Sequence, residues 1–452
     1  MSEAAAAVVL NVDGEWPILS IGELASADGG SIAIGPFGSS MKADTYTQTG
    51  IPVVRGNNLK GRPGFFGEFV YVSEETAARF ARCLVSPGDL VFPHRGAVGE
   101  VGLVVDQGFE RWMLSTSMMK LRPDPTRLDS SFAFYFFRSS LGRHQLLKNA
   151  SQVGTPGIGQ PLASLRACEL ALPPLNDQRA VASLLGALDD KIQQNRRTAQ
   201  ALERLARSIF RAWFVDFEPV KAKAAGATAF PSMPQSVFDA LPTRFVESDI
   251  GPVPEGWKVG AIKCLATISK AQINPQDRPE EFVDHFSLPA YDAEMRPTVE
   301  AGTAIKSNKF LVVPGCVLFS KLNPRIARVW LPPLVAGRRQ IASTEFLVFI
   351  PRQMSDRHYL YCQFQQTAFR EKLTQDASGT SNSHQRVRPD DVLNRPVIVP
   401  TAPIRIVFAG IADPLFALMS ENQDEAARLA TMRDYLLPKL LSGDVHVETA
   451  YG

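Results

Sequence analysis

The chain has 452 residues, and its 48 Lys and Arg against 46 Asp and Glu leave a net charge of +2 at pH 7. This length, with 45% hydrophobic and 21% charged residues, predicts two or three globular domains and excludes a disordered or fibrous protein, while the balanced charge gives no sign of a nucleic-acid partner. No run of 18 or more apolar residues occurs and the five cysteines form no CxxC pair, so we expect a cytoplasmic protein without a membrane span, zinc site or disulfide framework.

The first predicted part is a mixed α/β domain over residues 1–176. Strand-like runs separated by Gly and Pro turns lie at residues 51–55, 89–92, 101–105 and 118–121. A helix-like stretch follows at residues 131–148, and a strand ends at Pro173. The alternation of short strands and helices is typical of an α+β domain.

A long helix is predicted over residues 177–219, with Asn176 as its N-cap. Its apolar residues recur in steps of three and four, which is the heptad spacing of a coiled coil, and Asn195 is one polar step in that seam. Residues 177–214 alone would form a helix about 57 Å long. An apolar stripe of this length needs a partner helix.

The remaining parts repeat this order. Residues 220–250 are rich in Ala and Pro and are interpreted as a linker. Residues 251–400 form a second mixed domain with a helix-like stretch at 356–374, residues 401–445 form a second long helix, and 446–452 are a tail. Pro414 and Arg433 interrupt the apolar seam of this second helix, so we expect it to be less regular.

A tandem duplication explains the repeated order. The segment PGDLVF at residues 87–92 returns as PGCVLF at residues 314–319, an offset of 227. At the same offset Pro173 falls on Pro400, Asn195 on Asn422 and Leu202 on Leu429, whereas Trp16 falls on Trp257 at an offset of 241. The second copy is therefore 14 residues shorter in its first part.

A duplicated chain with pseudo-two-fold symmetry would pair its two long helices antiparallel. Because Asn195 and Asn422 occupy the same step of the two seams, we predict that their amides hydrogen-bond and set the helix register. The alternative is that each Asn faces solvent where the seam twists away. Replacing both by Leu would leave the register unchanged under that alternative.

Sequence motifs of catalysis are absent. There is no GxxxxGK[ST] phosphate loop, no HExxH or other histidine metal spacing, no Asn/Asp-Pro-Pro-aromatic tetrad and no PD…ExK nuclease pattern. The glycine cluster at residues 154–159 lacks the full dinucleotide fingerprint. We therefore expect no catalytic centre in the chain.

Polar loops remain as candidates for binding. They follow strand-like runs and combine Gly, amide and basic residues, which are the groups that contact phosphates and base edges. Residues 251–400 hold 19 basic and 14 acidic residues, whereas residues 1–176 hold 15 and 16. The basic excess therefore lies in the second mixed domain.

The sequence resembles the specificity subunits of type I DNA restriction–modification systems over nearly its whole length. The resemblance is carried by GPFGSS at residues 35–40 with GIPVVRGNN at 50–58, LPPLNDQR at 172–179, LDDKI at 188–192, WFVDFEP at 213–219, IGPVPEGW at 250–257 and LLPKLLSG at 436–443. The second copy departs from the family pattern at residues 403–405 and at Pro414, which concerns the regularity of the second long helix.

The resemblance implies a non-catalytic subunit of α+β class, in which two mixed α/β target recognition domains are separated by two long antiparallel coiled-coil helices. Each recognition domain would read one half of a bipartite, asymmetric site on double-stranded DNA. The helices would space the domains and dock two modification (methyltransferase) subunits, which carry S-adenosylmethionine and methylate adenine N6. Restriction subunits would add translocation and cleavage with ATP and Mg. No cofactor or metal is expected in this chain.

We predict DNA contacts from both domains on this basis. In the first domain they are Lys42, Arg55, Asn57, Asn58, Arg95, Gln152 and Thr155; in the second they are Lys321, Asn323, Arg325, Arg328, Asn382, His384, Gln385 and Arg386. Two other functions stay open: a stand-alone DNA methyltransferase or nuclease with diverged motifs, and an assembly adaptor that does not read DNA.

Overall fold

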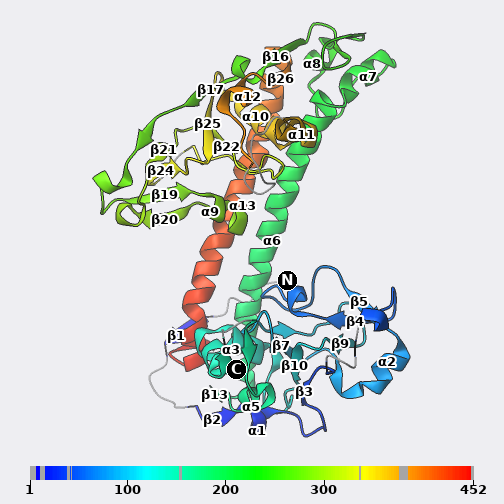
Figure 1. Cartoon of the computed structure of the whole chain (residues 1–452), viewed down its shortest axis with the longest axis vertical. Helices are drawn as coiled ribbons and strands as arrows, with labels where there is room; N and C mark the ends of the chain where they lie inside the picture. Colours follow the sequence, from blue (N-terminus) through cyan, green and yellow to red (C-terminus); the bar gives the residue numbers. More distant parts are fainter. Residues whose placement is uncertain are drawn as a thin grey trace. The chain divides into compact units, whose positions relative to one another are not determined.

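The computed structural model describes residues 7–10, 16–37, 41, 43–151, 155–334, 337–375 and 385–448. The chain forms two compact units: unit 1 comprises Met1–Asn195 and Glu425–Gly452, and unit 2 comprises Arg196–Asp424. Each unit contains one mixed α/β domain (Figure 1). The long helices α6 (Leu175–Phe214) and α13 (Ala402–Ser442) each begin in one unit and end in the other.

Unit 1 is built on two four-stranded sheets with the strand orders β3-β10-β7-β8 and β5-β4-β9-β6. Strands β4 and β9 run parallel, and the other neighbours in these two sheets run antiparallel. The strands are β1 (Ala7–Leu10), β2 (Ile18–Ser20), β3 (Ile32–Ile34), β4 (Ile51–Val54), β5 (Val70–Val72), β6 (Leu84–Val85), β7 (Leu90–Pro93), β8 (Gly102–Leu103), β9 (Trp112–Leu114), β10 (Met118–Leu121), β11 (Ala150–Ser151), β12 (Gly157–Ile158), β13 (Glu169–Ala171) and β27 (Val445–Glu448). The shorter helices are α1 (Ile21–Leu24), α2 (Glu74–Arg79), α3 (Ser130–Arg138), α4 (Ser140–Leu147) and α5 (Pro161–Arg166), with 3-10 turns at Ala43–Thr45, Gly56–Asn58 and Ala81–Cys83.

Unit 2 repeats this plan. Its sheets have the orders β17-β25-β22-β23 and β18-β21-β24-β19-β20, and β19 and β24 again form a parallel pair. The strands are β14 (Phe245–Val246), β15 (Val253–Pro254), β16 (Lys258–Ala261), β17 (Ala266–Ser269), β18 (Gln272–Ile273), β19 (Phe282–Phe286), β20 (Thr298–Ala301), β21 (Lys309–Leu311), β22 (Val317–Ser320), β23 (Val329–Trp330), β24 (Arg339–Ala342), β25 (Phe346–Pro351) and β26 (Pro396–Val399). The shorter helices are α7 (Glu218–Ala224), α8 (Gln235–Asp239), α9 (Leu288–Glu294), α10 (Arg357–Gln365), α11 (Thr367–Gln375) and α12 (Pro389–Leu393), with 3-10 turns at Ile262–Cys264, Pro275–Asp277, Gly302–Ala304 and Met354–Asp356.

Strand register confirms the duplication. In unit 1 Ser20 pairs with Glu169, and in unit 2 Ala261 pairs with Pro396. The first partners differ by 241 and the second by 227, which are the two offsets found in the sequence. The predicted tandem repeat is therefore also a repeat of strand pairing.

Two predicted helices each divide into two. The stretch 131–148 forms α3 and α4, because Ser139 ends the first helix in extended geometry and its hydroxyl then accepts the Gly142 amide at 3.1 Å as the N-cap of the second. The stretch 356–374 divides into α10 and α11 at Gln366, whose backbone is extended and whose side chain donates back to Cys362 O at 3.2 Å. The prediction of one helix per stretch was wrong at this capping step.

Residues 220–250 are folded, which contradicts their interpretation as a linker. They contain α8 and β14, and most of α7. Val220, Met233, Phe238 and Leu241 are buried in the apolar core of unit 2. Burial of these four apolar side chains holds the segment in place on the rest of unit 2.

The long helices pair within each unit. In unit 1 Asp189 contacts Arg433 at 2.6 Å and Asn195 contacts Glu425 at 2.9 Å, so the two helices run antiparallel there. In unit 2 the ring of Phe408 lies 5.8 Å from Phe210. Helix α6 starts at Leu175, so Asn176 is inside the first turn and is not the N-cap.

Helix α13 is continuous through Pro414, contrary to the expected irregularity. It contains an 18-residue window with a mean hydropathy of 1.6. By length and composition alone, the helix is long and apolar enough to cross a membrane. Phe408, Ala412 and Phe416 of this helix are buried in the core of unit 2. Such a pattern is also typical of the core helix of a soluble protein.

The predicted bond between Asn195 and Asn422 does not form. Asn195 is 2% exposed and donates its amide to Glu425, whereas the Asn422 amide donates to Leu418 O of its own helix at 2.7 Å. The equivalent seam positions therefore have different partners. The residue that bonds Asn195 is acidic, whereas the equivalent of Glu425 in the first copy, at the offset of 227, is Thr198.

Candidate DNA-reading loops

The strand ends of unit 1 gather several loops at one edge. Because β4 and β9 are parallel, their last residues, Val54 and Leu114, lie side by side, and the Ser115 amide donates to Val54 O at 3.0 Å. The end of β7 joins the same edge, since the His94 amide donates to Ser117 O at 2.8 Å. The loops that follow these strands therefore leave the domain together.

Two of these loops, residues 55–58 and 94–97, form what we call loop cluster 1 together with residues 155–157, which precede and enter β12. A Cβ atom built on Gly56 would lie 3.6 Å from Cβ of Ala97, so the first two segments touch. Arg95 forms an antiparallel bridge with Gly157, and the Gly96 amide donates to Pro156 O at 2.9 Å. The cluster brings together the exposed residues Asn57, Arg95 and Thr155.

Asn58 supports this cluster from inside. It is 1% exposed, and its amide donates to Phe66 O at 3.0 Å and to Glu68 O at 3.1 Å, while its carbonyl accepts the Arg55 amide. Its side chain is thus not available to a base edge, which contradicts its predicted DNA contact. Arg55 is half-buried and also donates to Glu68 O, at 3.2 Å.

His94 is a supporting residue that sequence reasoning missed. It is 7% exposed, and its Nε2 lies 3.2 Å from Thr116 O. Burial lowers the pKa of His94 below its usual range, although the contact with Thr116 opposes the shift. A neutral imidazole therefore links the loop after β7 to the loop after β9. The only signal in the sequence was its place between Pro93 and Arg95.

Unit 2 builds an equivalent cluster from residues 321–328 and 385–387, which we call loop cluster 2. The Asn323 amide donates to Gln385 O at 2.8 Å, the Val387 amide donates to Lys321 O at 3.2 Å, and Leu322 bridges with Arg386. The Leu322–Arg386 bridge matches the Arg95–Gly157 bridge at offsets of 227 and 229. Both units therefore join the same two loops.

The arginines of loop cluster 2 differ in their exposure to solvent and in their pairing with acidic residues. Arg328 is held in a two-bond contact with Asp292 at 2.7 Å and its side chain is 11% exposed, so it is a structural residue, contrary to prediction. Arg386 forms a similar pair with Glu345, at 3.0 and 3.1 Å, but its side chain is 49% exposed. Arg325 is exposed. Neither acidic partner could be chosen from the sequence, because each lies far along the chain from its arginine.

Four predicted contacts lie outside the described residues: Lys42, Gln152, Asn382 and His384. In the part of the chain that the structure describes, no group of three or more His, Cys, Asp or Glu is placed to hold a metal ion.

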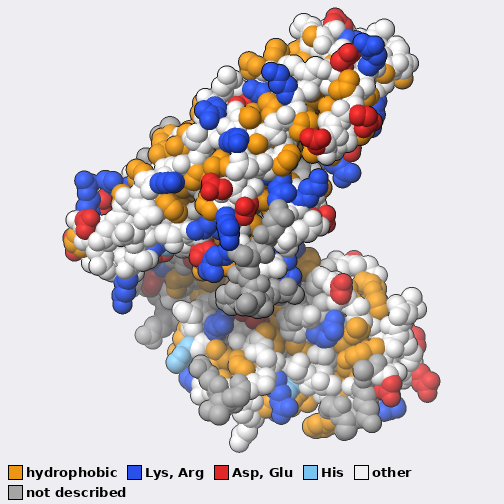
Figure 2. Space-filling model, turned by 45° about the horizontal axis from the view of Figure 1, so that its top comes forward, with side chains coloured by type: hydrophobic (Ala, Val, Ile, Leu, Met, Phe, Trp, Pro, Cys, Tyr) orange, Lys and Arg blue, Asp and Glu red, His pale blue; other side chains and the backbone are white. Residues whose placement is uncertain are grey.

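Lys and Arg side chains lie scattered among acidic and apolar ones on the visible face of unit 2 (Figure 2).

Comparison with known proteins finds relatives of the first domain and of the whole chain. Residues 14–204 match the Type I restriction modification DNA specificity domain, so the first domain belongs to a class of DNA-specificity modules. The type I restriction enzyme MjaIX specificity subunit of Methanocaldococcus jannaschii is 23% identical, with 96% of this chain and 94% of that protein covered. The HindI specificity subunit of Haemophilus influenzae is 24% identical, with 81% and 88% covered.

A solved structure shares the fold. The S subunit of a type I restriction–modification system from M. genitalium aligns with a TM-score of 0.59 at 13% identity and covers 96% of this chain and 98% of its own. The chain is therefore similar to type I specificity subunits over most of its length, and its first domain matches their DNA specificity domain.

Proposed function

We propose that loop clusters 1 and 2 each read one half of a bipartite site on double-stranded DNA. The observation that carries the proposal is that the same loops are joined in both units, by the bridges Arg95–Gly157 and Leu322–Arg386, while their exposed side chains differ. Equal scaffolds with unlike side chains suit an asymmetric target. Exposed Arg and Asn side chains are the groups that read G and A in the major groove.

The two long helices would set the distance between the half-sites. A straight helix of 40 residues, the length of α6, is about 60 Å long. Each helix also presents apolar side chains to solvent, including Leu205 of α6 and Leu418, Met432 and Tyr435 of α13, which are 44–61% exposed. We assign these faces to the docking of two methyltransferase subunits, because large apolar side chains in contact with water favour a protein partner.

The chemistry would reside in the partner subunits. The methyltransferase subunits would bind S-adenosylmethionine and methylate adenine N6, and restriction subunits would use ATP and Mg for translocation and cleavage. This chain would supply sequence choice in the cytoplasm without a cofactor or catalysis of its own. The absence of the catalytic sequence motifs supports this division.

One experiment tests the function. The chain is co-expressed with a type I methyltransferase subunit, and N6-methyladenine is mapped across the host genome. We expect a single two-part motif, one part of which changes when Asn57, Arg95 and Thr155 are replaced together. An unchanged motif would contradict the assignment of loop cluster 1. Methyl transfer by the purified chain alone would favour a stand-alone methyltransferase, and absence of any motif would favour an adaptor.

A further inference from the structure

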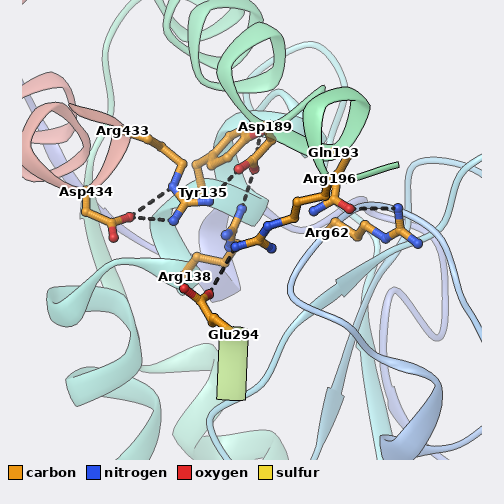
Figure 3. A network of polar contacts seen from close by, with 9 residues as sticks. All are labelled: Arg62, Tyr135, Arg138, Asp189, Gln193, Arg196, Glu294, Arg433 and Asp434. Carbon is orange, nitrogen blue, oxygen red and sulfur yellow. Dashed lines mark hydrogen bonds and ion pairs between the residues drawn. The ribbon is translucent and has the colours of Figure 1, made fainter. Parts of the chain in front are cut away.

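Asp189 is the centre of a polar network inside unit 1 (Figure 3). Its carboxylate accepts hydrogen bonds from Tyr135 Oη at 3.1 Å, from Arg138 Nη1 at 2.6 Å and from Arg433 Nη1 at 2.6 Å. Tyr135 and Arg138 come from α3, Asp189 from α6 and Arg433 from α13. The network therefore joins the mixed domain to both long helices.

The members of the network are withdrawn from water. Asp189 is 8% exposed, and the side chains of Arg138 and Arg433 are 18% and 17% exposed. Arg433 also contacts Asp434 at 2.7 Å. A charge that has lost most of its water is stable only beside an opposite charge with good geometry. Arg433, in the mostly apolar seam of α13, thus depends on Asp189.

The equivalent contact in unit 2 has no charges. At the offset of 227, Phe416 replaces Asp189 and Ala206 replaces Arg433, while Cys362 and Gln365 replace Tyr135 and Arg138. Ala206 and Phe416 are 1% and 5% exposed and lie in the same apolar core. The duplicated chain therefore has one charged and one apolar contact between its long helices.

This difference matters when a second copy of the chain is considered. Each of the two contacts, Asp189–Arg433 and Ala206–Phe416, has one residue on α6 and one on α13. Because the helices are copies of each other, α6 of one chain could also pair with α6 of a second chain, or α13 with α13, in the same geometry. Two copies of α13 would place Arg433 against Phe416 in both contacts. Two copies of α6 would place Asp189 against Ala206. Like pairing therefore leaves buried charges without their native cross-helix partner, whereas unlike pairing matches them.

A neighbouring contact, made by Glu425, also favours the pairing of α6 with α13. Glu425 of α13 accepts from Asn195 and lies 4.0 Å from Lys191, both on α6. The equivalents of Asn195 and Lys191 on α13 are Asn422 and Leu418. Pairing of two α13 helices would replace the lysine opposite Glu425 with a leucine.

We propose that the Asp189–Arg433 contact is a pairing-specificity device, which directs α6 to α13 and disfavours assembly of two chains through identical helices. A single polar group in an apolar helix interface is known to select partners in this way, at some cost in stability. The proposal does not depend on what the loop clusters bind.

The test moves the arginine from one helix to the other in the full-length chain. The double variant Ala206→Arg with Arg433→Ala conserves the amino-acid composition. It removes the aspartate–arginine contact from the α6–α13 pair and makes this contact possible between two α6 helices. Two α6 helices would then form two aspartate–arginine contacts, and two α13 helices would form two apolar ones. Within one chain, the new arginine would face Phe416 and Asp189 would face alanine. We expect the dimerisation constant, measured by sedimentation equilibrium, to tighten by at least about a hundredfold.

The chain offers a matched control. Ala201 and Arg428 are related by the same offset of 227, and both are exposed. The double variant Ala201→Arg with Arg428→Ala makes the same chemical exchange on the same helices, but away from the buried contact. Its dimerisation constant should equal that of the native chain. Equal dimerisation in the two exchanges would overturn the proposal.

A rescue variant covers the case in which the first exchange fails to fold. Adding Asp189→Phe and Phe416→Asp to Ala206→Arg and Arg433→Ala transfers the ion pair to unit 2 and restores matched unlike pairing. We expect this fourfold variant to be folded by circular dichroism and to sediment like the native chain. If it is no better folded and no more monomeric than the double variant, charge matching does not direct the pairing and the proposal fails.

Discussion

Asn195 donates its side-chain amide to the carboxylate of Glu425 at 2.9 Å. The helices α6 and α13 thus meet in unit 1 through two different polar residues, one of them acidic. Asn422, the equivalent of Asn195 in the second copy, bonds only within its own helix among the contacts described. The two asparagines are therefore expected to differ in their effect on stability.

Replacing Asn195 by Leu removes the donor to Glu425 and should lower the free energy of unfolding by about 1–2 kcal/mol, because a buried interhelical hydrogen bond is lost. Asn422→Leu should change it by less than about 0.5 kcal/mol, as expected for a site without a cross-helix partner. Denaturant unfolding of the full chain measures both. Equal losses would show that the two residues have the same role.

Asn58→Ala should destabilise unit 1 by about 2–3 kcal/mol, since three hydrogen bonds of a buried amide are removed. The neighbouring Asn57 is exposed, so Asn57→Ala should leave stability unchanged and alter only sequence choice. Hydrogen exchange in β4 and β9 reports the stability of unit 1. Faster exchange in the Asn57 variant would contradict the assignment.

Arg95→Ala should weaken binding of the cognate site by about 1–3 kcal/mol and relax one position of one half-site, as for an arginine that reads a guanine. Binding is measured with the methyltransferase subunits present, on DNA that carries each base in turn. Arg79 of α2 is an exposed arginine outside loop cluster 1 and serves as the control. A uniform loss across all sequences would instead indicate that Arg95 contacts a phosphate.

Arg325 and Arg328 lie in one loop but should act differently. Arg328→Ala breaks the two-bond contact with Asp292 and should lower the free energy of unfolding by about 1–3 kcal/mol. Arg325→Ala should change it by less than about 0.5 kcal/mol and should weaken DNA binding. The two variants are compared by thermal unfolding and by DNA titration. A stable Arg328 variant with altered site choice would return this residue to the DNA contacts.

His358 should make unit 2 less stable in mild acid. Burial, with a smaller contribution from Arg357, lowers the pKa of His358 to about 4 from its usual 6.5, despite the contact with Asp413. The unfolded histidine takes up a proton near pH 6.5 and the folded one only near pH 4. The unfolded state thus binds more protons between these values, and stability falls as the pH is lowered across them, by about 2–3 kcal/mol.

His358→Phe is the matching control, because it removes the titrating group and retains an aromatic ring against Phe416, on which His358 stacks at 4.7 Å. Its unfolding free energy should vary less between pH 6.5 and 4 than that of the native chain. Parallel pH profiles would show that other groups carry the acid sensitivity.

The sequence by itself determined the duplication, the two long helices and the strands that precede the first two segments of loop cluster 1. Each of these follows from a repeated offset or from a local period, and local patterns are encoded by neighbouring residues. The family resemblance rested on local segments such as LPPLNDQR at residues 172–179 and WFVDFEP at 213–219. The folded state of residues 220–250 was missed because Val220, Met233, Phe238 and Leu241 are widely spaced and show no period, although they are buried in the core of unit 2.

Only the tertiary structure decided which polar residues are free and which are paired. Asn58 is held by backbone oxygens up to ten residues away, Arg328 by Asp292 and Arg433 by Asp189, at separations of 36 and 244 residues. A side chain's partner across such distances depends on where the fold places it, and burial then makes the partner obligatory. For this reason the equivalent asparagines of the two copies, identical in sequence position, differ in structure.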